Sequence, residues 1–230
     1  MKPFDFFAAC TIATLALVSC VRMTSDEKTP SNISQEELDK VSYLVGYSFG
    51  QYIKGNDLGA LSLNQIEKGI KDAVASVEVD EEEFYEVLNE YMEKRSEASK
   101  SKNSSEADSF FKENGAKAGV VTTASGLQYQ ILRDGNGKKP GADDSVEVNY
   151  EGTLLDGTVF DSSYERGETA SFALSQVIAG WSEGLQHCEE GGEIILWLPS
   201  DLAYGETGAG SQIGPNAALK FRVELIKINP

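Results

Sequence analysis

VEVNYEGTLLDGTVFDSS, residues 146–163, decides the fold of this chain. Val146, Val148 and Tyr150 alternate with polar residues, which predicts a strand with one buried face. Asp156-Gly157 then predicts a turn before a second strand. That strand places Phe160 directly before Asp161, and a carboxylate beside an apolar ring is costly unless it is paired. The fold must therefore supply a partner for this carboxylate.

Working outward, more segments alternate between apolar and polar residues, and turn sequences rich in Gly separate them. The alternating apolar residues are Leu127, Tyr129, Ile131, Ile195, Trp197, Leu219, Phe221, Val223 and Leu225. Only residues 175–185 (SQVIAGWSEGL) show helical spacing here. This half is predicted to be an α+β domain in which one short helix packs across an antiparallel sheet. Two long loops, 162–170 and 203–215, are expected to form the walls of an apolar cleft with Trp181 as its floor.

The first half of the chain is predicted to be helical. Ser34 and Glu37 form a capping box, and apolar residues then recur at helical spacing to about Lys54. A second helix is expected from Ser62 to Val74, and a third from 80 to 92. Glycines 46 and 50, four residues apart, suggest that another backbone approaches the first helix closely.

From 93 to 108 the sequence is polar on every side, so it is expected to be a solvent-bridging helix or a linker. The predicted organisation is a helical domain at 34–92, a connecting segment at 93–119 and a sheet domain at 120–230.

The amino-terminal residues are typical of an export signal. The apolar run from Phe6 to Val18 is too short to span a bilayer and fits the core of a signal peptide, so residues 1–19 are expected to be removed. It ends in LVSC, residues 17–20, which is similar to a bacterial lipobox and predicts a lipid on Cys20. An ordinary secretory signal is the alternative. Residues 20–33 would then tether the protein to a membrane outside the cytoplasm, and Arg22 favours the outer membrane, on its periplasmic side.

Charge and cysteine content exclude several classes of function. The formal net charge is −17, so nucleic acid is not an expected partner. Cys10 leaves with the signal and Cys20 is lipidated, so Cys188 has no disulfide partner. His187-Cys188 could suggest a thiol protease, but adjacent side chains diverge and no third catalytic group is evident. His187 is the only histidine, so we expect no zinc site and no cofactor.

Residues 125–230 resemble the FKBP family of peptidyl-prolyl cis-trans isomerases. The resemblance rests on VEVNYEGTLLDGTVFDSS, then VIAGWSEGL, then LPSDLAYGETGAGSQIGPNAALKFRVELIKI, in this order. The helical first half, with SYLVGYSFGQYIK near its start and GVVTTASGLQYQIL after its end, resembles the dimerising amino-terminal domain of the Mip-type and FkpA-type periplasmic members.

The resemblance implies a pocket for the substrate proline with Trp181 as its floor. The implied catalytic residues are Tyr150, Phe160, Asp161, Trp181, Tyr204 and Phe221, and the implied substrate-binding residues are Arg166, Phe172, Val177, Ile178 and Ile213. The Tyr204 hydroxyl and the Ile178 N–H would donate hydrogen bonds to substrate carbonyls. Tyr150 and Arg166 are the expected partners of Asp161, which either acts on the carbonyl or only fixes the loop. Ala170 and Gln212 depart from the family pattern at the rim and bear on substrate preference.

The resemblance also implies that the protein isomerises prolyl bonds of unfolded or folding proteins as a homodimer formed through 34–92. Such catalysis requires neither nucleophile nor metal. A non-catalytic holdase chaperone and a purely structural surface lipoprotein are the alternatives.

Overall fold

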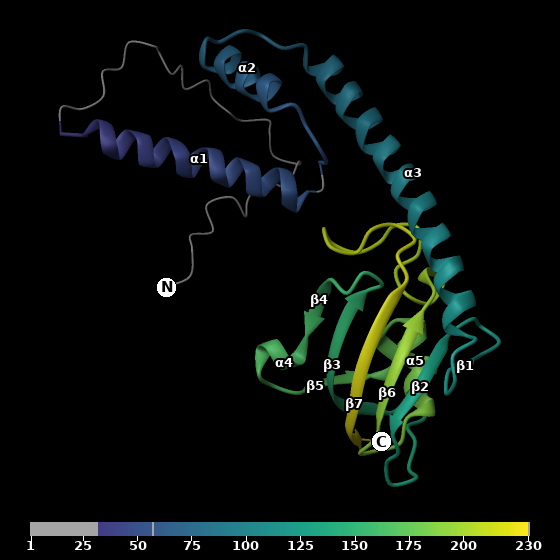
Figure 1. Cartoon of the computed structure of the whole chain (residues 1–230). Coiled ribbons are helices and arrows are strands. Elements are labelled where there is room, and N and C mark those ends of the chain that lie inside the picture. Colours follow the sequence, from purple (N-terminus) through teal and green to yellow (C-terminus); the bar gives the residue numbers. More distant parts are fainter. Residues whose placement is uncertain (1–31, 57, 230) are drawn as a thin grey trace. The chain divides into compact units, whose positions relative to one another are not determined.

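The computed structural model describes residues 32–56 and 58–229 (Figure 1). The chain divides between Tyr85 and Glu86 into two compact units, each of which is described by itself. The expected signal peptide, Cys20 and most of the expected tether lie outside the described residues.

The first unit contains α1 (Gln35–Gly55), α2 (Leu63–Val74) and the start of α3 (Glu81–Asn114). The predicted capping box at the start of α1 is confirmed, because the Ser34 hydroxyl accepts from the Glu37 N–H and the Glu37 carboxylate accepts from the Ser34 N–H at 2.8 Å. The Ser62 hydroxyl caps α2 by accepting from the Gln65 N–H, and the Asp80 carboxylate accepts from the N–H groups of Glu82 and Glu83 at the start of α3. Local hydrogen bonding therefore fixes where each helix begins.

No residue of α1 or α2 is buried within the chain. The exposed apolar side chains include Val41, Leu44, Val45, Phe49 and Tyr52 on α1 and Ile70 and Val74 on α2. Among the described residues, a Cβ atom built at Gly46 or Gly50 would meet nothing within 4 Å. None of the helices in the described part of the chain is long and apolar enough to cross a membrane.

The second unit contains an antiparallel sheet in the order β1-β2-β6-β7-β3-β4, with β5 also paired to β3 (Figure 1). The strands are β1 (Val121–Thr122), β2 (Gln128–Arg133), β3 (Ser145–Leu154), β4 (Val159–Ser162), β5 (Ala170–Ala173), β6 (Glu193–Leu198) and β7 (Leu219–Asn229). The long strand β3 pairs with β5 through its first half and with β4 through its second half, and β7 pairs along its other edge. The predicted α+β class is confirmed.

The core lies between the sheet and the short helices on one of its faces. Val146, Val148 and Tyr150 of β3 point into it, as the alternation predicted. On β6 the prediction was wrong about the face, because Ile194, Leu196 and Leu198 belong to the core. Trp197 instead lies on the opposite face, with its ring centroid 6.5 Å from that of Phe110. Both faces of β6 are covered, so the apolar pattern alone could not select the core side.

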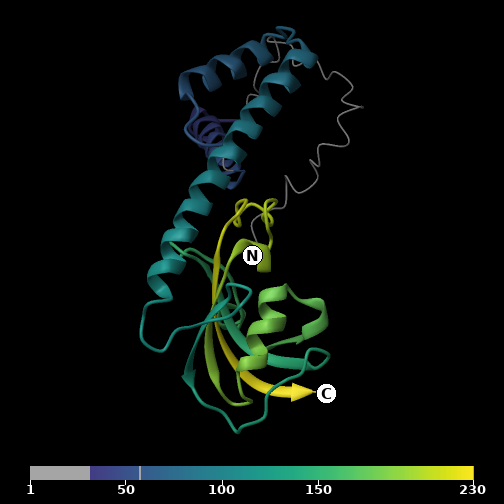
Figure 2. The ribbon, with the colours of Figure 1, turned by 90° about the vertical axis from the view of Figure 1, so that its right-hand side faces the viewer.

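The short helix α5 (Ala179–Gly184) packs on this face of the sheet (Figure 2). Two glycines set the distance between helix and strand. A Cβ atom at Gly180 would lie 2.2 Å from Cδ2 of Leu198, and one at Gly184 would lie 2.6 Å from Cδ2 of Leu196. Because larger side chains would clash, only glycine at these positions lets α5 approach β6 this closely.

The polar stretch after residue 93 is helical and forms the second half of α3. It does not face solvent on every side, since one stripe of its surface is partly shielded. That stripe comprises Ser99, Lys100, Asn103, Ser104, Ala107, Phe110, Phe111 and Asn114. Asn114 donates a hydrogen bond to Gln128 at 2.9 Å, and Gln128 donates to the Phe111 carbonyl at 2.8 Å. Hydrogen bonds to Gln128 of β2 and the ring contact of Phe110 with Trp197 of β6 therefore both hold this part of α3 against the sheet.

Candidate active site

An apolar cavity of about 360 Å³ opens between the sheet, α5 and the loop after β6. Its lining residues come from β3, β4, β5, the segment 176–181, the loop after β6, and β7. They are Tyr150, Phe160, Asp161, Phe172, Gln176, Val177, Ile178, Trp181, Tyr204 and Phe221. A largely aromatic cavity with a few polar groups is the usual form of a small-ligand or peptide site.

Trp181 forms the floor of this cavity. Its ring contacts the rings of Tyr150, Phe172 and Phe221, with centroid distances of 5.2, 5.3 and 5.2 Å and interplanar angles of 84° to 90°. Such edge-to-face contacts are favourable for aromatic rings and hold the indole in one orientation. Trp181 remains 4% exposed and lines the cavity. Its Nε1 has no hydrogen-bond partner within the described residues.

Asp161 lies at the edge of the cavity and is paired, as the sequence required. Tyr150 donates its hydroxyl hydrogen to Oδ2 of Asp161, and Arg166 Nη1 contacts Oδ1. Arg166 Nη2 also donates to the Tyr150 hydroxyl oxygen at 3.0 Å, which closes a three-residue network. The predicted partners of Asp161 are therefore in contact with it.

The network keeps Asp161 ionised. Partial burial acts to raise the pKa of the Asp161 carboxyl, but the hydrogen bonds from Tyr150 and Arg166 outweigh it and hold that pKa below its usual value. Burial raises the pKa of the Tyr150 hydroxyl, and the hydrogen bond to Asp161 raises it further. At neutral pH Asp161 is thus an anion and Tyr150 a neutral donor.

Local backbone contacts position β4 and the helix that follows it. The Tyr150 N–H donates to the Ser163 hydroxyl at 2.8 Å, and Ser162 caps α4 (Ser163–Arg166) by accepting from the Glu165 N–H. Gly167 ends α4 with φ 74°, a left-handed conformation that suits glycine. These contacts place Arg166, the last residue of α4, within reach of the Asp161 carboxylate.

The aromatic walls depend on a glycine behind them. A Cβ atom at Gly152 of β3 would lie 2.7 Å from ring carbons of Phe160 and 2.8 Å from the ring of Phe221. Those two rings meet edge to face at a centroid distance of 5.6 Å. Because Gly152 has no side chain, the rings of Phe160 and Phe221 can pack against β3.

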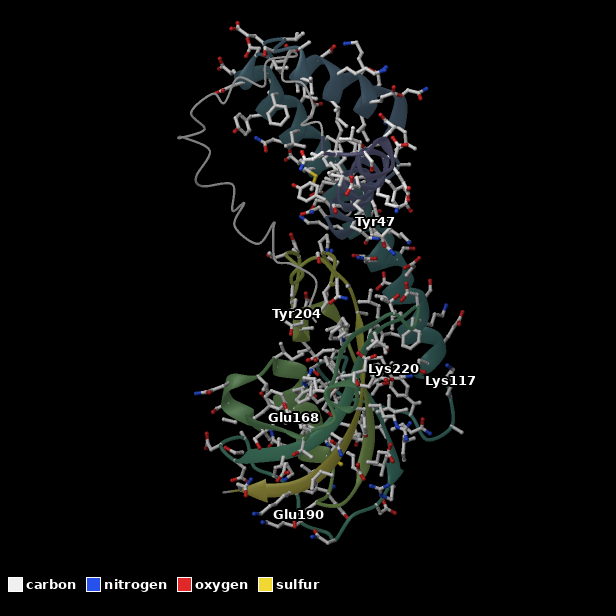
Figure 3. All side chains as sticks on the ribbon, turned by 90° about the vertical axis from the view of Figure 1, so that its left-hand side faces the viewer. Tyr47, Lys117, Glu168, Glu190, Tyr204 and Lys220 are labelled. Atoms are coloured by element: carbon white, nitrogen blue, oxygen red, sulfur yellow. The ribbon has the colours of Figure 1, made fainter. Side chains whose placement is uncertain are left out.

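Tyr204 reaches the cavity from the loop that follows β6. It is 39% exposed and lies at the end of the sheet opposite Glu190 (Figure 3). Its hydroxyl group can serve as a hydrogen-bond donor to a bound peptide.

Not every predicted site residue lines the cavity. Arg166 contacts Asp161 and Tyr150 but is not among the lining residues, and Ile213 is only 8% exposed and belongs to the core. Conversely, Gln176 lines the cavity and was not predicted. Its position directly before Val177 and Ile178 was the one available signal.

His187 and Cys188 do not form the nucleophile and base of a thiol protease. His187 stacks on Tyr129 with a centroid distance of 4.4 Å and an interplanar angle of 9°. Cys188 is fully buried, and this burial raises the pKa of its thiol to about 12. A thiol in this environment stays protonated and is not a nucleophile.

The fold and the aromatic cavity together define a class of protein, the prolyl isomerases of FKBP type, and the family comparisons agree. Residues 136–226 match the family FKBP-type peptidyl-prolyl cis-trans isomerase, and residues 38–131 match the domain amino terminal to FKBP-type peptidyl-prolyl isomerase. The chain belongs to the FKBP-type peptidyl-prolyl cis-trans isomerase family and is an enzyme of this type.

Individual relatives cover most of both chains. A probable FKBP-type peptidyl-prolyl cis-trans isomerase FkpA of Neisseria meningitidis serogroup B is 42% identical over 203 residues, which are 83% of this chain and 74% of that protein. The outer membrane protein MIP of Legionella longbeachae is 37% identical, over 94% of this chain and 97% of that protein. The crystal structure of FkpA from Escherichia coli matches 86% of this chain and 98% of that chain, with a TM-score of 0.64 and 35% identity.

Proposed function

We propose that the aromatic cavity is where this isomerase acts, and that its substrates are proline-containing segments of unfolded or folding proteins outside the cytoplasm. The observation that carries the proposal is the Trp181 floor, walled by aromatic rings, with an ionised Asp161 held at the edge. Catalysis there is non-covalent.

The physical problem is a rotation barrier of about 18–20 kcal/mol in the prolyl amide. The planar amide is more charge-separated than the twisted form, so transfer from water into an apolar cavity weakens the advantage of the planar state. A barrier lowered by about 7 kcal/mol gives roughly a 10⁵-fold acceleration. An aromatic cavity is suited to this task.

Polar groups at the edge then have to hold the peptide while its amide turns. Tyr204 donates a hydrogen bond to a substrate carbonyl, and the Ile178 N–H donates to another on the far side of the proline. Asp161 either acts on the turning carbonyl or keeps the β4 loop in place through Tyr150 and Arg166. Val177 and Phe172 supply apolar contact with the proline ring.

A protease-coupled assay on a short Xaa-Pro peptide tests this. We expect Trp181→Ala, Asp161→Ala and Tyr204→Phe to lower kcat/KM. Tyr164→Phe, on an exposed tyrosine outside the cavity, and Asp143→Asn, on an exposed carboxylate, serve as matched controls and should stay near wild type. Wild type no faster than Trp181→Ala would remove the cavity as the site of catalysis.

The holdase alternative predicts a different pattern. A holdase would suppress aggregation of an unfolded client even in Asp161→Ala, whereas isomerisation requires the intact cavity. The two activities can coexist, and the assays separate them. Absence of both would favour a structural surface lipoprotein.

The homodimer is proposed from the first unit. Residues 34–92 expose the apolar residues of α1 and leave Gly46 and Gly50 open to an approaching backbone. Few helices with no buried residue are stable alone, so we expect a second copy of the chain to bury these apolar residues. Under this proposal 93–119 connects the dimerisation domain to an isomerase domain at 120–230. Sedimentation equilibrium of the chain without residues 1–20, with only monomer seen, would overturn it.

The proposed location is a bacterial membrane surface outside the cytoplasm, on the periplasmic side of the outer membrane. The support is the lipobox-like sequence ending in Cys20 and the name of the Legionella relative, outer membrane protein MIP. Mass spectrometry of the amino-terminal peptide tests the lipid on Cys20, and Cys20→Ala should release the protein from the membrane fraction.

A further inference from the structure

The polar stripe of α3 is joined to the loop that carries Tyr204. Asn103 donates from Nδ2 to the Pro215 carbonyl at 2.8 Å, and Asn216 donates from its own Nδ2 to the Ser104 hydroxyl at 3.1 Å. Both bonds are partly shielded from solvent and span 112 residues of sequence. The loop lies beside α3 in Figure 1.

A short chain of hydrogen bonds connects α3 to the backbone beside Tyr204. The Asn216 N–H donates to the Gly205 carbonyl at 2.9 Å, and Gly205 directly follows Tyr204. Asn216 therefore links the Ser104 hydroxyl to the residue next to Tyr204. Asn216 has φ 56°, a left-handed conformation that asparagine adopts more readily than most residues.

Other contacts hold this loop as well: the Gly205 N–H donates to the Ser200 carbonyl at 2.9 Å, the Gly208 N–H donates to the Tyr204 carbonyl at 3.2 Å, and Ile213 belongs to the core. The loop has one isolated bridge, between Ala209 and Ile213, and three of its glycines have positive φ. Tyr204 itself is more than a third exposed, so its orientation depends on the backbone that carries it. The ion pair between Lys100 and Glu206, at 3.5 Å, joins the same two segments but is exposed on the glutamate side and adds little.

We propose that Asn103 and Ser104 are positioning residues for the isomerase: the helix clamps the 205–216 loop and thereby sets Tyr204 at the cavity. This inference rests on the role proposed above for Tyr204 as a donor to the substrate. It makes the polar stripe of α3 part of the active-site scaffold rather than a linker.

The test uses the full chain with the double variant Asn103→Ala/Ser104→Ala. Alanine favours helix, so loss of α3 cannot explain the result. The matched control is Ser101→Ala/Ser105→Ala, on the exposed side of the same helix. The first readout is hydrogen exchange of the Ile213 and Asn216 amides without substrate, which we expect to be faster by about fivefold or more only in the clamp variant.

The second readout is kcat/KM on an Xaa-Pro peptide. The clamp variant should lose about three- to tenfold, in line with two weakened hydrogen bonds, while the control stays within about twofold of wild type. Tyr204→Phe should then cost less in the clamp variant than in wild type, since both changes remove the same interaction.

The proposal is overturned if the Asn103→Ala/Ser104→Ala variant shows unchanged hydrogen exchange or a wild-type kcat/KM. It is also overturned if the effects of this variant and of Tyr204→Phe on kcat/KM are fully additive. A wild type without turnover would instead defeat the proposed site of catalysis, and the exchange measurement would still decide whether the clamp exists. The two failures are therefore distinguishable.

Discussion

The hydroxyl group of Tyr150 donates a hydrogen bond to Oδ2 of Asp161, between the adjacent strands β3 and β4. Because Tyr150 also packs against Trp181, one side chain joins the apolar floor of the cavity to its charged edge. The neighbouring Phe160 and Asp161 are thus compatible, since the ring faces Phe221 and the carboxylate faces its donors.

Tyr150→Phe removes this donor while keeping the ring. A hydrogen bond to a charged group is worth about 1.5–3 kcal/mol, and water can replace part of it at a half-exposed carboxylate, so we expect the free energy of unfolding to fall by about 1 kcal/mol. kcat/KM should fall about tenfold, because Asp161 loses its orientation. Urea denaturation and the peptide assay measure both, with Tyr164→Phe as the control. No change in either would mean that the bond is not formed in solution.

The ion pair of Asp161 with Arg166 predicts a pH dependence. The pKa of Asp161 in the folded protein lies below its ordinary value of 3.8, so the pair stabilises the fold above that value and the contribution is lost as the pH falls through the folded pKa. The stability difference between wild type and Asp161→Asn should be constant from neutral pH to about pH 5 and shrink below about pH 4. Urea midpoints across this range test it, with Asp143→Asn as the control. A difference that grows on acidification contradicts the assignment.

Gly152→Ala tests the room behind the aromatic walls. The added methyl group must displace Phe160 or Phe221, so we expect a loss of about 1–3 kcal/mol in stability together with reduced kcat/KM. Gly141→Ala is the control, since a Cβ atom there makes only an ordinary 3.7 Å contact with Asp144. Equal behaviour of the two variants would show that the rings have free space.

Gly180→Ala tests the close packing of α5 on β6. The new Cβ would overlap Leu198, and the expected loss of stability is about 1–3 kcal/mol. Leu198→Ala should be destabilising alone by about 2–5 kcal/mol but should relieve part of the clash in the double variant. Thermal denaturation of wild type, the two single variants and the double variant completes a double-mutant cycle. Additive losses of stability would argue against a contact between residues 180 and 198.

Sequence patterns predicted those features that local chemistry determines. The capping box at Ser34 and Glu37 fixed the start of α1, and the alternation in β3 identified its buried face. The same reasoning misassigned the core face of β6, because Trp197 is covered on the other side by a helix distant in sequence.

Part of the site could also be predicted from the sequence, because local chemistry determines it. Asp161 beside Phe160 demanded a partner, and the structure supplies Tyr150 and Arg166. The contacts of Asn103 and Ser104 were not predictable, since a polar residue in a polar stretch carries no signal of what it touches. For Gln176 the one available signal was its position directly before Val177 and Ile178. Only the tertiary fold brings these groups to the cavity and its loop.

The most direct test of the central claim uses the two tryptophans of the chain as internal probes. In ¹⁵N-labelled protein their indole N–H groups give two NMR signals, and an Xaa-Pro peptide is titrated while exchange between its cis and trans forms is followed in the same sample. Binding in the cavity predicts that the Trp181 signal shifts, that the Trp197 signal stays, and that cis–trans exchange accelerates; a matched Xaa-Ala peptide should shift neither signal. Accelerated exchange with an unmoved Trp181 signal would contradict catalysis in this cavity.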